Sequence, residues 1–131
     1  MSRLKELDVG VSKVIGIDSD VVEARVNLKW LFTAGTPGLM PDGTLPPDIE
    51  GQTRQAWANI FAALNAAGMK PRDLIKVNTT LSREEDIALS VKVRKEVLTR
   101  TKPTHTLTVA AQKVKPQYLV ELEIIAAATV A

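Results

Sequence analysis

The chain has 131 residues, of which 45% are hydrophobic and 24% are charged, and its formal net charge at pH 7 is +2. These values are typical of one globular domain with its own hydrophobic core, and we predict a single domain over residues 1–131. The sequence has no cysteine and one histidine, His105, which excludes disulfides, a cysteine nucleophile and a zinc centre with several histidines from one chain. We therefore expect no metal and no cofactor.

Composition also argues against two classes of partner. Basic residues form no dense run and aromatic residues make up 4% of the chain, whereas nucleic-acid-binding surfaces usually combine a basic stripe with stacking aromatics. The charged start of the chain lacks the apolar region of a secretory signal. The apolar tail, Ile124–Ala131, is far shorter than the roughly 20 residues of a membrane span. We expect a cytoplasmic protein without nucleic-acid or membrane partners.

The first third of the chain predicts strands followed by a long loop. Residues 21–26 and 30–34 are rich in β-branched and aromatic side chains, and residues 27–29 are short enough for a hairpin turn between them. Thr36–Pro47 then contains four prolines and two glycines, which are incompatible with a helix or a central strand.

The remaining elements follow from periodicity and capping signals. Residues 48–67 have apolar side chains at helical spacing, ending at Gly68, and residues 74–81 alternate as in a strand. Ser82-Arg83-Glu84-Glu85 fits a capping box with Ser82 as N-cap, so a second helix is predicted up to about residue 100. Its expected core-facing residues are Ile87, Ala88, Val91 and Leu98. Two strands, at 104–110 and 118–127 with a turn at 113–117, complete the prediction.

This order of elements predicts an α+β fold with both helices on one face of a mixed sheet. The other face then has no cover within the chain. The last strand carries apolar residues on both of its sides, which favours coverage of that face by a second subunit.

Three features suggest chemistry, and each has a purely structural alternative. Glu121 and Glu123 are two residues apart on a strand and share a face, so they either activate water in a cleft or remain solvated carboxylates. His105 starts a strand and is either an acid/base or anion-binding group, or a hydrogen-bonded histidine near a loop. The two glycines of Thr33–Gly38 either present N–H groups to an anion or form a tight turn.

Four segments, in order, resemble those of the RidA/YjgF family, which is also described as L-PSP endoribonuclease-like. The resemblance runs from about Leu31 to Ala127. The segments are Leu31–Thr36, Gln52–Ala56 with Asn59-Ile60, Asp73–Val77 and Val120–Glu123. They are similar to the family's strand ending in Ser-Gly-Gln, its first helix, its Asp-Ile-Val-Lys-Thr strand and its closing Val-Glu-Ile-Glu.

The resemblance implies a chorismate-mutase-like fold and a homotrimer whose three sheets form a central barrel, with a small-molecule site in each cleft between subunits. The best-known family activity is hydrolysis of enamines and imines to 2-keto acids and ammonia. By position, Glu121 matches the glutamate that places the attacking water, and the cleft would be lined near Gly35, Thr36 and Leu107.

By the same resemblance, this chain looks like a divergent member, because His105 stands where the family has its substrate-binding arginine. Imidazole lacks the planar fork that holds a carboxylate, which argues against 2-iminopropanoate deaminase activity. Thr36 and Val91 replace a glutamine and an asparagine, and the family's Gly-Pro-Tyr segment is absent. Two functions stay open. One is an enamine/imine hydrolase in which Glu121 acts on water and a nearby His105 binds or protonates the substrate; the other is a non-catalytic metabolite-binding or regulatory trimer.

Overall fold

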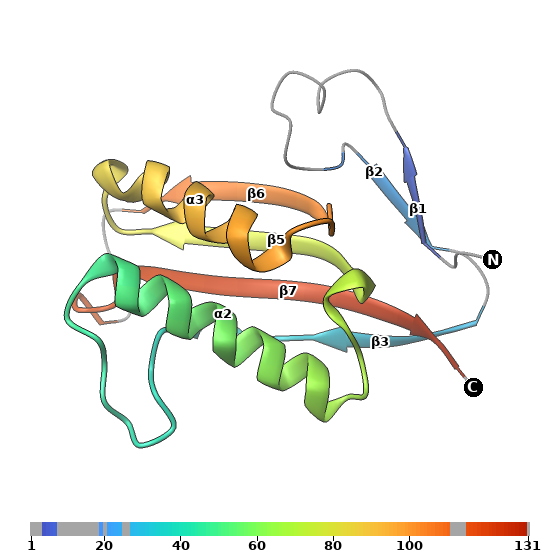
Figure 1. Ribbon diagram of the computed structural model, residues 1–131, viewed down its shortest axis with the longest axis horizontal. Helices are drawn as coiled ribbons and strands as arrows, with labels where there is room; N and C mark the ends of the chain where they lie inside the picture. Colours follow the sequence, from blue (N-terminus) through green and yellow to red (C-terminus); the bar gives the residue numbers. More distant parts are fainter. Residues whose placement is uncertain (1–3, 8–18, 20, 25–26, 111–114, 131) are drawn as a thin grey trace.

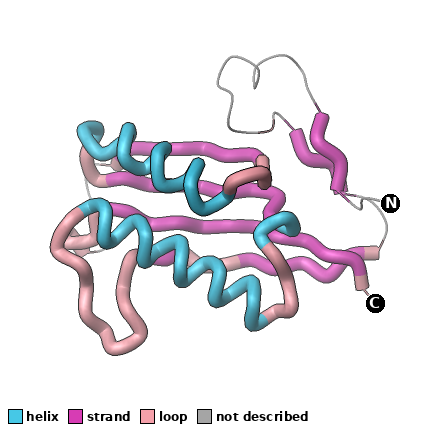
Figure 2. The backbone as a smooth tube through the Cα atoms, viewed as in Figure 1, coloured by secondary structure: helices cyan, strands magenta, loops and turns pink. Residues whose placement is uncertain are grey.

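Two helices lie together on one face of a sheet (Figures 1 and 2). The computed structural model describes residues 4–7, 19, 21–24, 27–110 and 115–130. The helices are α2 (Ile49–Ala66) and α3 (Ile87–Leu98), and the short 3₁₀ turns η1 (Pro71–Asp73) and η2 (Glu84–Asp86) precede β5 and α3. This arrangement confirms the predicted α+β fold with both helices on one side.

The main sheet has five strands and is mixed. Four of them lie across it in the order β3 (Leu28–Phe32), β7 (Val120–Thr129), β5 (Leu74–Leu81) and β6 (Thr104–Val109). The short β4 (Thr36–Pro37) also pairs with β7, which runs antiparallel to β3, β4 and β5. β5 and β6 are parallel. Because β7 has ten residues, it provides the central partner for three other strands.

The core lies between the helices and the sheet. Helix α2 begins after Asp48, whose carboxylate accepts the Gly51 N–H at 2.9 Å, and it ends before Gly68, which has φ of +71°. Each large side chain buried there contributes on the order of 1.5–3 kcal/mol through removal from water. The largest fully buried apolar side chains are Trp57, Ile60, Leu64, Val77, Leu81, Val93, Val120, Leu122 and Ile124.

The start of the second helix differs from the prediction. Ser82 is not its N-cap, because the Ser82 hydroxyl donates to the Tyr118 carbonyl at 2.8 Å. The turn η2 intervenes, and α3 begins five residues later at Ile87. Of the expected core-facing residues, Leu98 is buried and Ile87 packs against the core, whereas Val91 is half-buried and Ala88 is exposed. The buried positions of α3 are Ser90, Val93, Arg94 and Leu98.

The N-terminal hairpin was predicted with the wrong partners. β2 (Val21–Ala24) pairs antiparallel with β1 (Leu4–Leu7), while β3 pairs with β7. Leu28 and Lys29 therefore belong to a strand and not to a turn. β3 pairs with β7 at five positions, which is more than the four residues of β2 could provide. Residues 25 and 26 of the predicted strand, and 113 and 114 of the predicted turn, lie outside the described residues.

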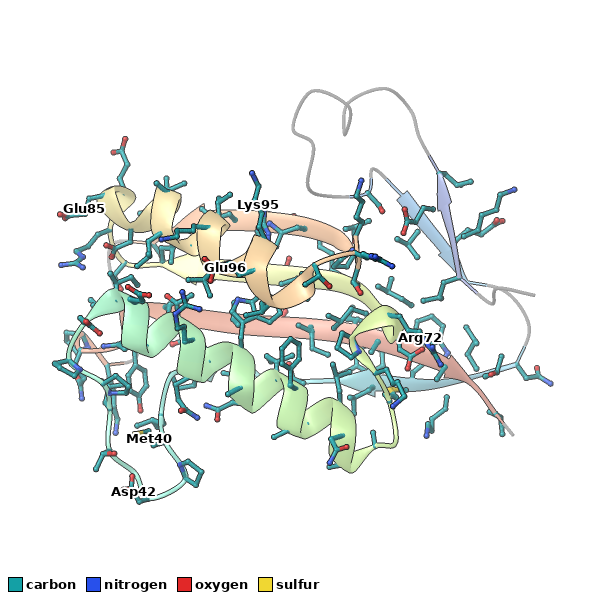
Figure 3. All side chains as sticks on the ribbon, in the orientation of Figure 1. Met40, Asp42, Arg72, Glu85, Lys95 and Glu96 are labelled. Carbon is teal, nitrogen blue, oxygen red and sulfur yellow. The ribbon has the colours of Figure 1, made fainter. Side chains whose placement is uncertain are left out.

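The loop between β4 and α2 is fixed to the helix at both of its ends. The Asn59 side chain donates to the carbonyls of Pro37 at 3.0 Å and Leu39 at 2.8 Å. The buried Gln52 side chain donates to the carbonyl of Pro46 at 3.0 Å. Between these anchors the loop extends away from the helices, with Met40 and Asp42 near its tip (Figure 3). Apart from β4, the loop predicted for 36–47 is confirmed.

Candidate functional site

The two carboxylates of the last strand lie on the face of the sheet that the helices leave open. Val120, Leu122 and Ile124 are buried beneath the helices, so the alternate residues Glu121 and Glu123 point the other way. In the register with β5, Glu121 is opposite Thr80 and Glu123 is opposite Asn78. The Asn78 amide donates to Glu123 at 3.2 Å. The two glutamates therefore share a face, as predicted.

A hollow of about 260 Å³ surrounds Glu121. Gly35 packs directly against the glutamate, because a Cβ built on Gly35 would lie 2.8 Å from the Glu121 Oε2 atom. The described lining contains two carboxylates and no cationic side chain, so the hollow favours a neutral or positively charged molecule. Its lining residues are Gly35, Asn78, Thr79, Thr80, Thr108, Glu121, Leu122 and Glu123.

His105 lies on the opposite face of the sheet, beneath α3. It pairs with the buried Val77 in β5, and its Nε2 atom is 2.8 Å from the Thr79 hydroxyl oxygen. The Arg94 guanidinium, which α3 contributes and which is 5% exposed, contacts both ring nitrogens. The expectation that His105 lies within reach of Glu121 is therefore wrong within one chain, because the strand register turns the two side chains to different sides.

The surroundings of His105 keep its ring neutral. Burial, followed by the positive charges of Arg94 and Lys76, lowers the pKa of His105 to about 3. A neutral ring can accept a hydrogen bond from Arg94 at one nitrogen and donate to Thr79 from the other. The arrangement supplies an acceptor to a buried guanidinium, and a second arginine in place of the histidine could not do so.

This low pKa predicts an acid-sensitive fold. Between about pH 3 and the usual histidine pKa of about 6.5, the unfolded chain binds a proton that the folded chain does not, so stability falls as the pH falls through that window. When the pH falls from 7 to 5, we expect protonation of His105 in the unfolded chain to lower the free energy of unfolding of the wild type by about 2 kcal/mol. Urea unfolding of wild type and His105→Gln at both pH values measures this. An equal loss in the two proteins would contradict the assignment.

The other predicted site residues are divided between the two faces. Gly35 lines the hollow, and Thr36 follows it in β4, where the Thr36 hydroxyl donates to the Ala34 carbonyl at 2.9 Å. Leu107 pairs with Thr79 and packs against the core on the helix side, as His105 does. The roles assigned to these residues by resemblance stay predictions.

Sequence reasoning missed the polar residues that complete the hollow, namely Asn78, Thr80 and Thr108. The signal for two of them was the alternation in 74–81, which places Asn78 and Thr80 opposite the side of Val77. That alternation does not show which strand lies beside β5. The pairing of β5 with β7 brings these residues to the glutamates.

Two kinds of feature are absent from the part of the chain that the structure describes. No group of three or more histidine, aspartate or glutamate side chains is placed to hold a metal ion there. None of the helices in these ranges has the length and apolar character needed to cross a membrane.

Comparison with known proteins identifies the family of this chain. The sequence pattern of Endoribonuclease L-PSP matches residues 19–128. A RutC family protein from Pyrococcus horikoshii is 34% identical over 116 residues, which cover 87% of this chain and 89% of that protein.

Two solved structures extend the comparison. The crystal structure of Escherichia coli TdcF with bound serine has a TM-score of 0.72 at 28% identity, covering 76% of this chain and 81% of TdcF. YyfB of the Rid family, from Yersinia pestis, has a TM-score of 0.84 at 22% identity, covering 95% of this chain and 98% of YyfB, and so shares its fold. The chain therefore belongs to the Endoribonuclease L-PSP family, which is the RidA/YjgF family that its motifs resemble.

Proposed function

We propose that this protein hydrolyses small reactive imines, and the enamines that tautomerise to them, at the hollow beside Glu121. The observation that carries the proposal is the placement of the Glu121 carboxylate against Gly35 in a hollow large enough for a small molecule. A related protein supports the choice of reaction, since TdcF, 29% identical over 95 residues, is named as a proposed reactive intermediate deaminase.

Glu121 would act on water as a general base. As the water oxygen adds to the imine carbon, its proton passes to Glu121 and the C=N bond becomes a C–N single bond. Glu121 then returns that proton to the nitrogen, which gives a neutral carbinolamine. As the C–N bond breaks and the carbonyl forms, Glu121 accepts the hydroxyl proton and passes it to the departing nitrogen. One imine and one water thus give one carbonyl compound and one ammonia.

The charge of the hollow suits the reactive form of such a substrate. A protonated imine is a cation, and the hollow presents the carboxylates of Glu121 and Glu123 to it. Thr80 and Thr108 add polar residues to the lining beside them. The described lining offers no side chain for a bidentate grip on a substrate carboxylate, so we expect discrimination among imines to rest on size and charge at the C=N group.

We further infer that the hollow faces a neighbouring subunit in a homotrimer. Trp30 and Phe32 lie on the same open face, since they pair with Ala127 and Ile125 of β7. They are 50% and 67% exposed, and their rings stack with centroids 6.3 Å apart. Large apolar side chains gathered in this way are typical of a surface that another chain covers.

A non-catalytic binding module is the second candidate, and the position of His105 favours it. The histidine that was expected to bind or protonate the substrate faces Arg94 and is neutral, so Glu121 would have to move every proton itself. In that case the hollow would bind a small molecule and stabilise the fold without turnover.

A coupled assay distinguishes the two functions. An amino-acid oxidase generates imines in the presence of semicarbazide, and we expect the protein to slow semicarbazone formation by hydrolysing the imine first. Glu96→Gln is the matched control, because Glu96 is an exposed glutamate that pairs with Arg54 on the helices. Absence of an effect for wild type and control, with the protein folded, would contradict the hydrolase and favour the binding module.

Gly35→Ala tests the contact between Gly35 and Glu121. The added methyl group would displace the flexible end of Glu121 while meeting no backbone atom within 4 Å among its nearest contacts. We expect at least about a tenfold loss of kcat/KM, since small misplacements of a catalytic group are costly. The midpoint of thermal unfolding should change little. A variant with full activity would show that the position of the carboxylate does not matter.

A further inference from the structure

We propose a second binding site, for a small organic anion, in a cavity at the end of the sheet where β5 begins. The cavity has a volume of about 320 Å³ and shares no lining residue with the hollow at Glu121. Its lining residues are Leu4, Glu6, Val22, Arg72, Leu74, Arg100, Thr101 and Lys102.

The cavity is formed where the paired strands β1 and β2 meet the end of the main sheet. η1 contributes Arg72, which Figure 3 labels, and the connection from α3 to β6 contributes Arg100, Thr101 and Lys102. Ser19 ties the N-terminal part to this connection, because its N–H donates to the Pro103 carbonyl at 3.2 Å and its hydroxyl donates to the Lys102 carbonyl. Ser19 is therefore fixed to the same connection that contributes three of the lining residues.

Among the described residues that line this cavity, three have cationic side chains and one, Glu6, has a carboxylate. Arg72, Arg100 and Lys102 make no ion pair with any residue that the structure describes. Arg54 and Arg83, in contrast, each contact carboxylates of neighbouring residues. These cations give the described part of the lining an excess of positive charge that an anion would neutralise.

The helix ends nearby do not require these cations. Lys29 already donates to the Ala67 carbonyl beyond the end of α2, at 2.6 Å. At the end of α3, the N–H groups of Thr99 and Thr101 donate to the carbonyls of Lys95 and Leu98. Among the described residues, Arg72, Arg100 and Lys102 donate no side-chain hydrogen bond to a helix carbonyl.

The rest of the lining determines what kind of anion fits. Leu4 and Val22 are half-buried and Leu74 is 2% exposed, so part of the wall is apolar. A bare inorganic ion would leave this part uncovered, whereas an organic carboxylate or phosphate monoester would place its charge on the arginines and its carbon atoms on the apolar wall. The shared feature is an oxyanion that carries a small apolar group.

Isothermal titration of the full chain tests the proposal with four probes: benzoate, phenyl phosphate, inorganic phosphate and the neutral benzyl alcohol. We expect benzoate or phenyl phosphate to bind at least tenfold more tightly than both inorganic phosphate and benzyl alcohol. The benzoate and phenyl phosphate titrations distinguish a carboxylate from a phosphate ligand. Absence of binding by both organic anions, or equal binding of benzyl alcohol, would overturn the proposal.

Variants then locate the binding. The double variant Arg72→Gln with Arg100→Gln should lower the affinity for the organic anion at least tenfold and leave imine hydrolysis unchanged. Arg54→Gln is the control, because Arg54 is an exposed arginine on α2, and it should leave this affinity unchanged. Glu121→Gln should also retain binding, which separates this site from the hollow. Unchanged affinity in the double variant, with the fold intact by circular dichroism, would place the anion elsewhere and overturn the assignment.

Discussion

Glu121→Gln should lower kcat/KM for imine hydrolysis by about 10²–10⁴-fold, the range expected for loss of a general base. The substitution keeps the size of the side chain and its contact with Gly35, but the amide cannot accept a proton from water at neutral pH. Because Glu121 is half-buried and makes no ion pair with a described residue, the free energy of unfolding should change by less than about 1 kcal/mol.

The neighbouring carboxylate is the matched control for this prediction. Glu123→Gln alters a more exposed residue on the same face, which accepts from Asn78, and we expect no more than about a tenfold effect from loss of one negative charge near the substrate. The coupled semicarbazide assay with purified proteins measures both variants. If Glu121→Gln retained wild-type turnover while Glu123→Gln lost it, the general base would be Glu123.

His105→Arg should destabilise the fold by about 2–4 kcal/mol, because it places a second guanidinium beside the buried Arg94. The neutral imidazole accepts a hydrogen bond from Arg94, and an arginine has donors only. His105→Gln keeps one acceptor and one donor for Arg94 and Thr79, so its cost should be below about 1.5 kcal/mol.

Urea unfolding of wild type, His105→Arg and His105→Gln at pH 7 provides the measurement. A His105→Arg protein as stable as wild type would show that the new side chain turns out of the helix–sheet interface. Catalytic gain in that variant would then indicate that a family-like arginine site can be restored. Loss of stability confined to His105→Arg supports a structural pairing of His105 with Arg94.

Residues that carry the family resemblance also organise the loop before α2. Gln52 and Asn59 are spaced seven residues apart, so they lie on the same side of α2, and each donates to carbonyls of this loop. Gly38 lies so close to the Gln52 backbone that a Cβ would collide with it. The same contacts hold the chain just after Gly35, which links the helix motif to the position of Glu121.

Local patterns were sufficient where one element decides its own structure. Helical spacing and Gly68 defined α2, the alternation of 74–81 defined β5, and the strand period placed Glu121 and Glu123 on a shared face. Backbone geometry sets each of these features over a few consecutive residues, so no distant partner was needed to predict them.

Tertiary structure decided which segments became neighbours and which side of the sheet each residue faces. The structure pairs β3 with β7 and brings His105 into contact with Arg94, and both contacts join different segments of the chain. It also starts α3 later than the local capping signal predicted. A strand displaced by one residue reverses the face of every side chain, and burial against distant helices selects the register. For this reason the sequence by itself identified Glu121 and His105 as candidates, whereas only the folded sheet showed that they lie on opposite sides of it.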